Sequence, residues 1–259
     1  VYKRQALCNS ANRMDARKRS YPWITWKNVI SSRREYPRMT RNLTPITLVL
    51  GPVMLFAGYA SWPITNQVGS EAVGLLRDDA SLPLAALGVL GMCLVFSSLH
   101  LLSMDMKQGA DGTSKQLLNM ADLFIFGTFG LFLIGFGAQL STIIITNDTS
   151  TVFENQAARE AAAEVGFTAA YSIWSLTPVV WGLSMICLGL AHVGLKMPEN
   201  MTEGAFGLLV PVGFAHTMLW FIQDLEQAEF NILFPVTMIL YIALGGLMMA
   251  GKIDAPGSN

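Results

Sequence analysis

Six long runs of apolar residues, containing a single charged side chain, constrain this chain more than any other feature of its sequence. The charge is Asp122, and the runs cover residues 44–62, 82–104, 120–145, 167–195, 204–223 and 230–251. A hydrocarbon core about 30 Å thick needs roughly 20 residues of α-helix. Strands of a membrane barrel would instead alternate in polarity over about ten residues. The runs therefore predict an all-α polytopic membrane protein, a bundle of six transmembrane helices.

The composition argues against a soluble enzyme, because 52% of the residues are hydrophobic and 14% are charged. An average soluble domain carries about 25% charged residues, which solvate its surface. The phosphate loop GxxxxGK[ST], the GxSxG elbow and the HExxH helix are all missing from the sequence. These motifs usually mark nucleotide hydrolysis, serine hydrolases and zinc proteases. We expect no enzymatic activity, no catalytic residue and no cofactor.

The basic residues are distributed asymmetrically, and this predicts the orientation. Eleven of the 17 Lys and Arg residues lie in the first 41 positions, beside two acidic residues. Four more follow even-numbered spans: Lys107, Lys115, Lys196 and Lys252. The other loops are acidic and hold only Arg77 and Arg159. Because cytoplasmic loops are enriched in Lys and Arg, we expect both termini in the cytoplasm. A nucleic-acid-binding arm is the alternative for the basic head, but its position beside a span favours the membrane, so we expect no nucleic-acid partner.

The predicted organisation has three parts. A basic cytoplasmic segment covers 1–43, the six-helix domain covers 44–251, and a cytoplasmic tail covers 252–259. The chain begins with Val1, so we interpret its start as a fragment or a sequence-assembly scar, with Met14 and Met39 as candidate starts. No import signal is visible, and we expect a multi-pass protein of the inner (plasma) membrane. Its first partner is then the lipid bilayer.

Polar and aromatic residues within the spans are the candidates for a solute path. The third span holds several Gly and Phe residues, which either pack against neighbouring helices or narrow a passage that gates by dewetting. The candidates for lining a path are Asn42, Pro45, Phe126, Thr128, Phe129, Gln139, Thr142 and His216. With no nucleotide-binding motif, transport of a small solute is the remaining expectation.

The three histidines leave an alternative open. His100, His192 and His216 all lie in predicted spans, and neutral imidazole is a common axial ligand of haem. A membrane-anchored haem-binding redox subunit is therefore a second hypothesis. A structural hydrogen bond, a proton relay and pore lining are the other interpretations of these side chains. No cluster with metal-ligand spacing is present in the sequence, so no metal site is predicted. An assembly or sensor protein without any path is a third hypothesis.

Two stretches resemble the acetate uptake transporter family, the succinate–acetate permeases. The family opens its first helix with Asn-Pro-Ala-Pro-Leu-Gly-Leu, where this chain has Asn42-Leu43-Thr44-Pro45-Ile46-Thr47-Leu48. The family's third helix carries Ser-Tyr-Gly-Ser-Phe-x-Leu, and the similar stretch here is Ile125-Phe126-Gly127-Thr128-Phe129-Gly130-Leu131. The chain departs from the family at Leu43, at Phe126 in place of Tyr, and at Gly51, which aligns with a pore-narrowing Phe.

The resemblance implies a fold of six helices, a function and a set of site residues. It implies a homo-oligomer in which each protomer forms its own path for acetate or a similar small monocarboxylate, coupled to protons. Asn42 and Pro45 would shape the cytoplasmic start of the first helix, and Phe126 would stand in a constriction of the third. A neutral, narrow path suits such a solute, because a charge is costly in hydrocarbon.

Overall fold

The computed structural model describes residues 36–61, 69–76, 81–147, 152–195, 203–219, 221 and 227–253. The chain divides into two units, Val1–Pro37 and Arg38–Asn259, and everything described below belongs to the second except the first two residues of one helix. Most of the predicted basic segment 1–43, and the tail from residue 254, therefore lie outside the described residues.

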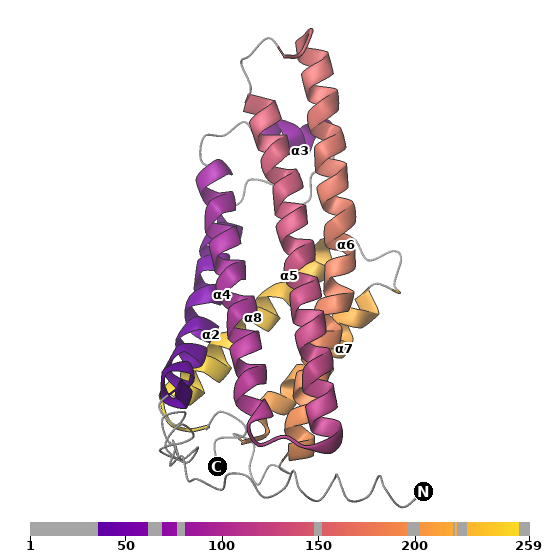
Figure 1. Cartoon of the computed structure of the whole chain (residues 1–259). Helices are drawn as coiled ribbons and strands as arrows, with labels where there is room; N and C mark the ends of the chain where they lie inside the picture. Colours follow the sequence, from indigo (N-terminus) through magenta and orange to yellow (C-terminus); the bar gives the residue numbers. More distant parts are fainter. Residues whose placement is uncertain are drawn as a thin grey trace, which may run out of the picture. The chain divides into compact units, whose positions relative to one another are not determined.

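All regular structure in the described part of the chain is helical (Figure 1), as predicted. Its elements are α2 (Tyr36–Ala60), α3 (Gly69–Leu75), α4 (Ser81–Lys107), α5 (Gly112–Asn147), α6 (Gln156–Leu195), the 3-10 helix η2 (Glu203–Leu208), α7 (Leu209–Leu219) and α8 (Gln227–Met249). Five helices, α2, α4, α5, α6 and α8, are long and apolar enough to cross a membrane. The described residues thus form a helical protein with five candidate spans. The sixth apolar segment, Gly204–Leu219, is shorter.

Helix α6 begins earlier than the predicted span 167–195. The predicted spans leave residues 146–166 as an outer loop, in which residues 154–164 are rich in helix formers. Instead, one helix of 40 residues runs from Gln156 to Leu195. Asn155 caps it, because its side-chain oxygen accepts a hydrogen bond from the N–H of Ala158 at 2.9 Å. The helix-forming residues of the predicted loop lead into the span without a helix-breaking proline, so the two segments are continuous.

The predicted fifth span, 204–223, is a shorter helical segment that changes from 3-10 to α-helix between Leu208 and Leu209. Pro211 lies in the first turn of α7, where a missing N–H is tolerated. A continuous α-helix would need that N–H to bond the carbonyl of Gly207, four residues earlier. The residues before α7 are wound as the 3-10 helix η2. The change from 3-10 helix to α-helix therefore lies close to the proline.

Helices α5 and α6 lie side by side (Figure 1) and are longer than a bilayer requires. With 36 and 40 residues, they extend over about 54 and 60 Å at 1.5 Å per residue, well beyond a hydrocarbon core of about 30 Å. The short helix α3, which the sequence did not predict, packs on them through a second apolar cluster. This cluster includes Val73, Leu76, Ile143 and Phe167.

Glycines allow several helices to approach at backbone distance. A Cβ atom added at Gly91 of α4 would lie 2.9 Å from the backbone nitrogen of Leu55 in α2. One added at Gly213 of α7 would lie 2.9 Å from the nitrogen of Ile186 in α6, and one at Gly245 of α8 would lie 2.8 Å from the carbonyl of Pro45 in α2. Such contacts are typical of packing between membrane helices.

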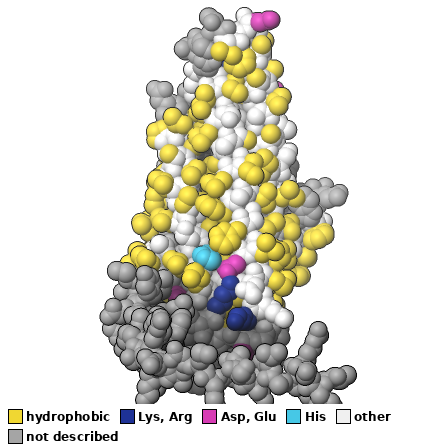
Figure 2. Space-filling model, in the orientation of Figure 1, with side chains coloured by type: hydrophobic (Ala, Val, Ile, Leu, Met, Phe, Trp, Pro, Cys, Tyr) yellow, Lys and Arg dark blue, Asp and Glu magenta, His cyan; other side chains and the backbone are white. Residues whose placement is uncertain are grey.

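Large apolar side chains point outward from the helices. Figure 2 shows them over much of the described face, with histidine and basic side chains towards one end and acidic side chains towards both ends. Leu123, Ile134 and Ile144 of α5 are among the exposed residues. A soluble protein rarely exposes apolar patches this extensive, whereas lipid chains would cover them.

Candidate functional site

Trp181 lies at the centre of the apolar core and is fully buried. Its ring contacts aromatic rings from four other helices, with centroid distances between 5.2 and 6.2 Å. These rings belong to Phe96 of α4, Phe132 of α5, His216 of α7, and Phe234 and Tyr241 of α8. The tryptophan of α6 therefore connects the packing of five helices.

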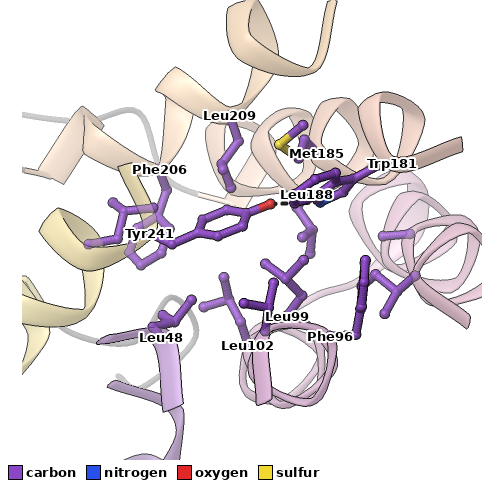
Figure 3. Close-up of a cluster of buried hydrophobic side chains, with 14 of the residues drawn as sticks. Leu48, Phe96, Leu99, Leu102, Trp181, Met185, Leu188, Phe206, Leu209 and Tyr241 are labelled. Atoms are coloured by element: carbon purple, nitrogen blue, oxygen red, sulfur yellow. Dashed lines mark hydrogen bonds between the residues drawn. The ribbon is translucent and has the colours of Figure 1, made fainter. Parts of the chain in front are cut away.

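Two hydrogen bonds between helices involve Trp181 and the His216 ring that packs on it. Trp181 Nε1–H donates to Tyr241 Oη at 3.0 Å (Figure 3), and His216 Nε2 lies 2.7 Å from Thr237 Oγ1. The Thr237 hydroxyl donates to the carbonyl of Leu233 at 2.9 Å, so its oxygen accepts from His216. This pattern assigns a proton to Nε2, and in a neutral ring Nδ1 is then the acceptor nitrogen.

These contacts differ from those of several other buried hydroxyl groups. The hydroxyls of Thr128, Thr142 and Ser184 donate to carbonyls three or four residues earlier in their own helices. Such local bonds satisfy a hydroxyl group anywhere in a membrane helix. The Trp181–Tyr241 and His216–Thr237 pairs instead join different helices. We call Trp181, His216, Thr237 and Tyr241 the intramembrane seam.

A buried carboxylate lies at the end of α4. Asp105 is 4% exposed and accepts a hydrogen bond from the Thr44 hydroxyl of α2 at 3.0 Å. The sequence ended the second span at residue 104, which placed Asp105 in a loop. The helix continues to Lys107, so this carboxylate becomes part of the contact between α2 and α4.

A second polar cluster joins α4 to α5 near the same end. His100 Nδ1 lies 3.2 Å from one oxygen of Asp122, and the Lys107 ammonium group donates to the other oxygen. The side chains are 31%, 16% and 24% exposed for His100, Asp122 and Lys107. Asp122 is thus paired, as expected for a carboxylate within an apolar span.

Phe126, which was predicted to stand in a constriction, lies at the surface of the described residues. Its side chain is 55% exposed, and its ring packs on His100 with a centroid distance of 4.9 Å. The inward face of α5 instead carries residues spaced three or four apart, including Thr128, Phe132 and Gln139. Phe126 lies off that face. Phe132 is the phenylalanine of α5 that reaches Trp181.

The other predicted path residues are placed as follows. Pro45 is buried, with its carbonyl against Gly245 of α8, whereas the side chain of Asn42 lies outside the described residues. Phe129 is half-buried, with its ring centroid 5.8 Å from that of Phe96. Gln139 is 2% exposed on the inward face of α5. Only His216 of the predicted set belongs to the seam.

The three histidines have different surroundings. His100 pairs with Asp122, His192 packs on Phe206 with a centroid distance of 5.2 Å, and His216 bonds Thr237. None of the contacts described here joins two of these histidines. Within the described ranges, no group of three or more His, Cys, Asp or Glu side chains is placed to hold a metal ion. The haem hypothesis gains no supporting geometry.

Sequence reasoning missed three members of the seam. Trp181, Thr237 and Tyr241 lie in uncharged runs, where the sequence does not separate an interior side chain from a lipid-facing one. The available signal was the pairing of an indole and a phenol, both of which seek partners when buried.

No protein-family model, curated protein or solved structure matches the chain. The resemblance to the acetate uptake transporters therefore remains a prediction from its motifs.

Proposed function

We propose that the chain crosses the inner (plasma) membrane six times, with both termini in the cytoplasm, and that it transports a small solute. In addition to the five candidate spans, η2 with α7 forms a span that is the fifth in chain order. Their six and 11 residues extend over about 28 Å, because a 3-10 helix rises about 2.0 Å per residue and an α-helix about 1.5 Å. That length is close to the thickness of the hydrocarbon core. Lys107, Lys115 and Lys252 then lie on one side.

Cysteine labelling in whole cells tests this topology. In a background without Cys8, Cys93 and Cys187, the variants are Lys115→Cys, Phe221→Cys and Lys252→Cys. We expect a membrane-impermeant maleimide to label Phe221→Cys in intact cells, because η2 and α7 bring residue 221 to the outer side. Lys115→Cys and Lys252→Cys should react only after permeabilisation. Labelling of Phe221→Cys only in permeabilised cells would mean that α7 does not cross.

The intramembrane seam is the observation that supports transport. Polar side chains inside a membrane are costly and usually functional. Here two hydrogen-bonded pairs from α6, α7 and α8 lie in the interior, although packing alone would be satisfied by apolar residues. Trp181 fills the space between them. In this proposal its ring closes the route, and movement of the ring opens it.

The solute class follows from the family resemblance. Acetate, or a similar small monocarboxylate, is the proposed cargo, with proton coupling and a homo-oligomer in which each protomer has its own route. The seam is compatible with this cargo, because it offers indole, imidazole and hydroxyl groups within a few ångströms of one another. Such groups can exchange hydrogen bonds with a carboxyl group.

Uptake into proteoliposomes tests the transport function. We expect labelled acetate to enter protein-containing vesicles several-fold faster than empty ones, and faster with an inward proton gradient. The empty vesicles are essential, because acetic acid also crosses bare lipid. Uptake equal to that of empty vesicles, with and without the gradient, would contradict acetate transport.

A further inference from the structure

The charged side chains of the candidate spans lie near the helix ends. Asp105 and Lys107 end α4, and Asp122 lies ten residues into α5. No Asp, Glu, Lys or Arg occurs from residue 123 to 147 of α5, from 165 to 195 of α6, or in α7. The seam is therefore built entirely from neutral donors and acceptors.

A neutral seam discriminates between the two forms of a weak acid. An anion at mid-membrane loses its hydration and finds no fixed cation, which costs at least several kcal/mol. The two N–H groups of the seam, those of Trp181 and His216, already bond Tyr241 and Thr237. An anion would have to break these bonds. An uncharged solute can pass while these bonds stay intact, because it has no charge for the N–H groups to solvate.

The seam also has hydrogen-bonding capacity for an uncharged solute. The Tyr241 hydroxyl accepts from Trp181, and among the described contacts its own hydrogen is directed to no acceptor. It can therefore donate to a carbonyl oxygen. Thr237 Oγ1 accepts from His216 and donates to Leu233, and a second lone pair remains on that oxygen. A solute with a carbonyl oxygen and an O–H or N–H group complements this pair of hydroxyls.

We infer that the solute crosses the seam as an uncharged molecule with a carbonyl acceptor and an O–H or N–H donor, namely an undissociated small carboxylic acid or a primary amide. This inference rests on the proposed transport function and names the species transported. An acid that enters undissociated brings one proton per carboxylate and releases both on the far side. The transfer moves no net charge. Proton coupling then requires no proton-carrying side chain.

Two fluxes through the full-length protein in proteoliposomes separate the alternatives. The first is the swelling rate in acetamide, followed by stopped-flow light scattering. The second is formate or acetate uptake at an alkaline pH, where both are almost wholly ionised, driven by a potassium diffusion potential. We expect acetamide to enter several-fold faster than into empty vesicles. The potential-driven anion uptake should equal that of empty vesicles.

The outcomes distinguish the inference from the function on which it rests. Potential-driven anion flux above that of empty vesicles would overturn the inference and leave the transport function intact. If neither of these fluxes, nor the internal acidification caused by acetate at acid pH, exceeds that of empty vesicles, the inference and the transport function are both wrong. Uncharged acetic acid is compared with acetamide by adding acetate at acid pH and following internal acidification. Acidification above the empty-vesicle rate supports the acid as cargo. Swelling in acetamide without such acidification identifies the amide as the cargo.

A matched pair of variants tests the role of the hydroxyl group. Tyr241→Phe removes the proposed donor, so we expect a several-fold loss of acetamide flux. Tyr171→Phe makes the same change on α6 at a side chain that is 42% exposed, and should leave the flux unchanged. Thermal melting of both variants checks that they fold. An unchanged flux in folded Tyr241→Phe would overturn the assignment of this hydroxyl to the solute.

Discussion

Replacement of Trp181 by alanine is expected to lower the free energy of unfolding by about 3–5 kcal/mol, as for other buried Trp or Phe residues truncated to alanine. The indole is fully buried and contacts rings from α4, α5, α7 and α8, so its removal leaves a cavity bordered by four helices. In a bilayer the loss is mainly one of packing contacts, because lipid is as apolar as the core. The same variant should also leak solute, since Trp181 closes the proposed route.

The measurements are thermal or denaturant unfolding in detergent and acetamide flux in vesicles. Phe214→Ala is a suitable control, because this aromatic residue of α7 is 57% exposed and lies outside the seam. We expect Phe214→Ala to lower the free energy of unfolding by well under half as much as Trp181→Ala does. Its acetamide flux should equal that of the unsubstituted protein. A Trp181→Ala protein as stable as the control would show that the ring is not central to packing. A stable variant without increased flux would contradict its role in closing the route.

Gly182→Leu is expected to disrupt the contact between α6 and α7. A Cβ atom at Gly182 would collide with the carbonyl oxygen of Gly213 and the hydroxyl of Thr217, and would lie 2.9 Å from the nitrogen of Thr217. Backbone atoms cannot move aside as a flexible side chain can. Overpacking typically costs about 1–3 kcal/mol and occasionally more, and a blocked backbone contact belongs to the upper end of that range. Separation of the helices would also pull His216 away from Trp181.

Gly137→Leu makes the identical change on α5, where a Cβ atom would meet nothing within 4 Å. Leucine has the higher helix propensity, by up to about 1 kcal/mol, so we expect this variant to be at least as stable as the unsubstituted protein. Melting temperature and the monodispersity of the purified protein compare the two. Equal melting temperatures for the two variants would contradict the close approach of α6 and α7. A large loss in Gly137→Leu would indicate that this face of α5 is covered by another chain.

The sequence predicted the class of fold well because one physical constraint dominates it. Runs near residues 82–104 and 120–145 contain too few charges for a soluble helix, and α4 and α5 form there. The boundaries were less accurate, because hydropathy reports lipid contact rather than helix length. Helix α6 therefore continues through residues that were predicted to form an outer loop, and Asp105 lies inside α4 rather than after it.

The candidate site was largely beyond the sequence. Phe126 and Phe132 have similar surroundings in the chain, yet one is 55% exposed and the other reaches Trp181. In a soluble helix, polar residues would mark the outer face. In an apolar span both faces are hydrophobic, so the sequence does not reveal which side of the helix is inward.

The sequence by itself determined that the described chain is helical and apolar, and that its charges avoid the spans, because unpaired backbone groups and charges are both costly in hydrocarbon. Only the tertiary structure decided which polar groups meet. Trp181 and Tyr241 are 60 residues apart, and their hydrogen bond depends on how α6 and α8 are rotated against each other. That rotation is set by packing, including the close glycine contact of α6 with α7. Local sequence does not specify it.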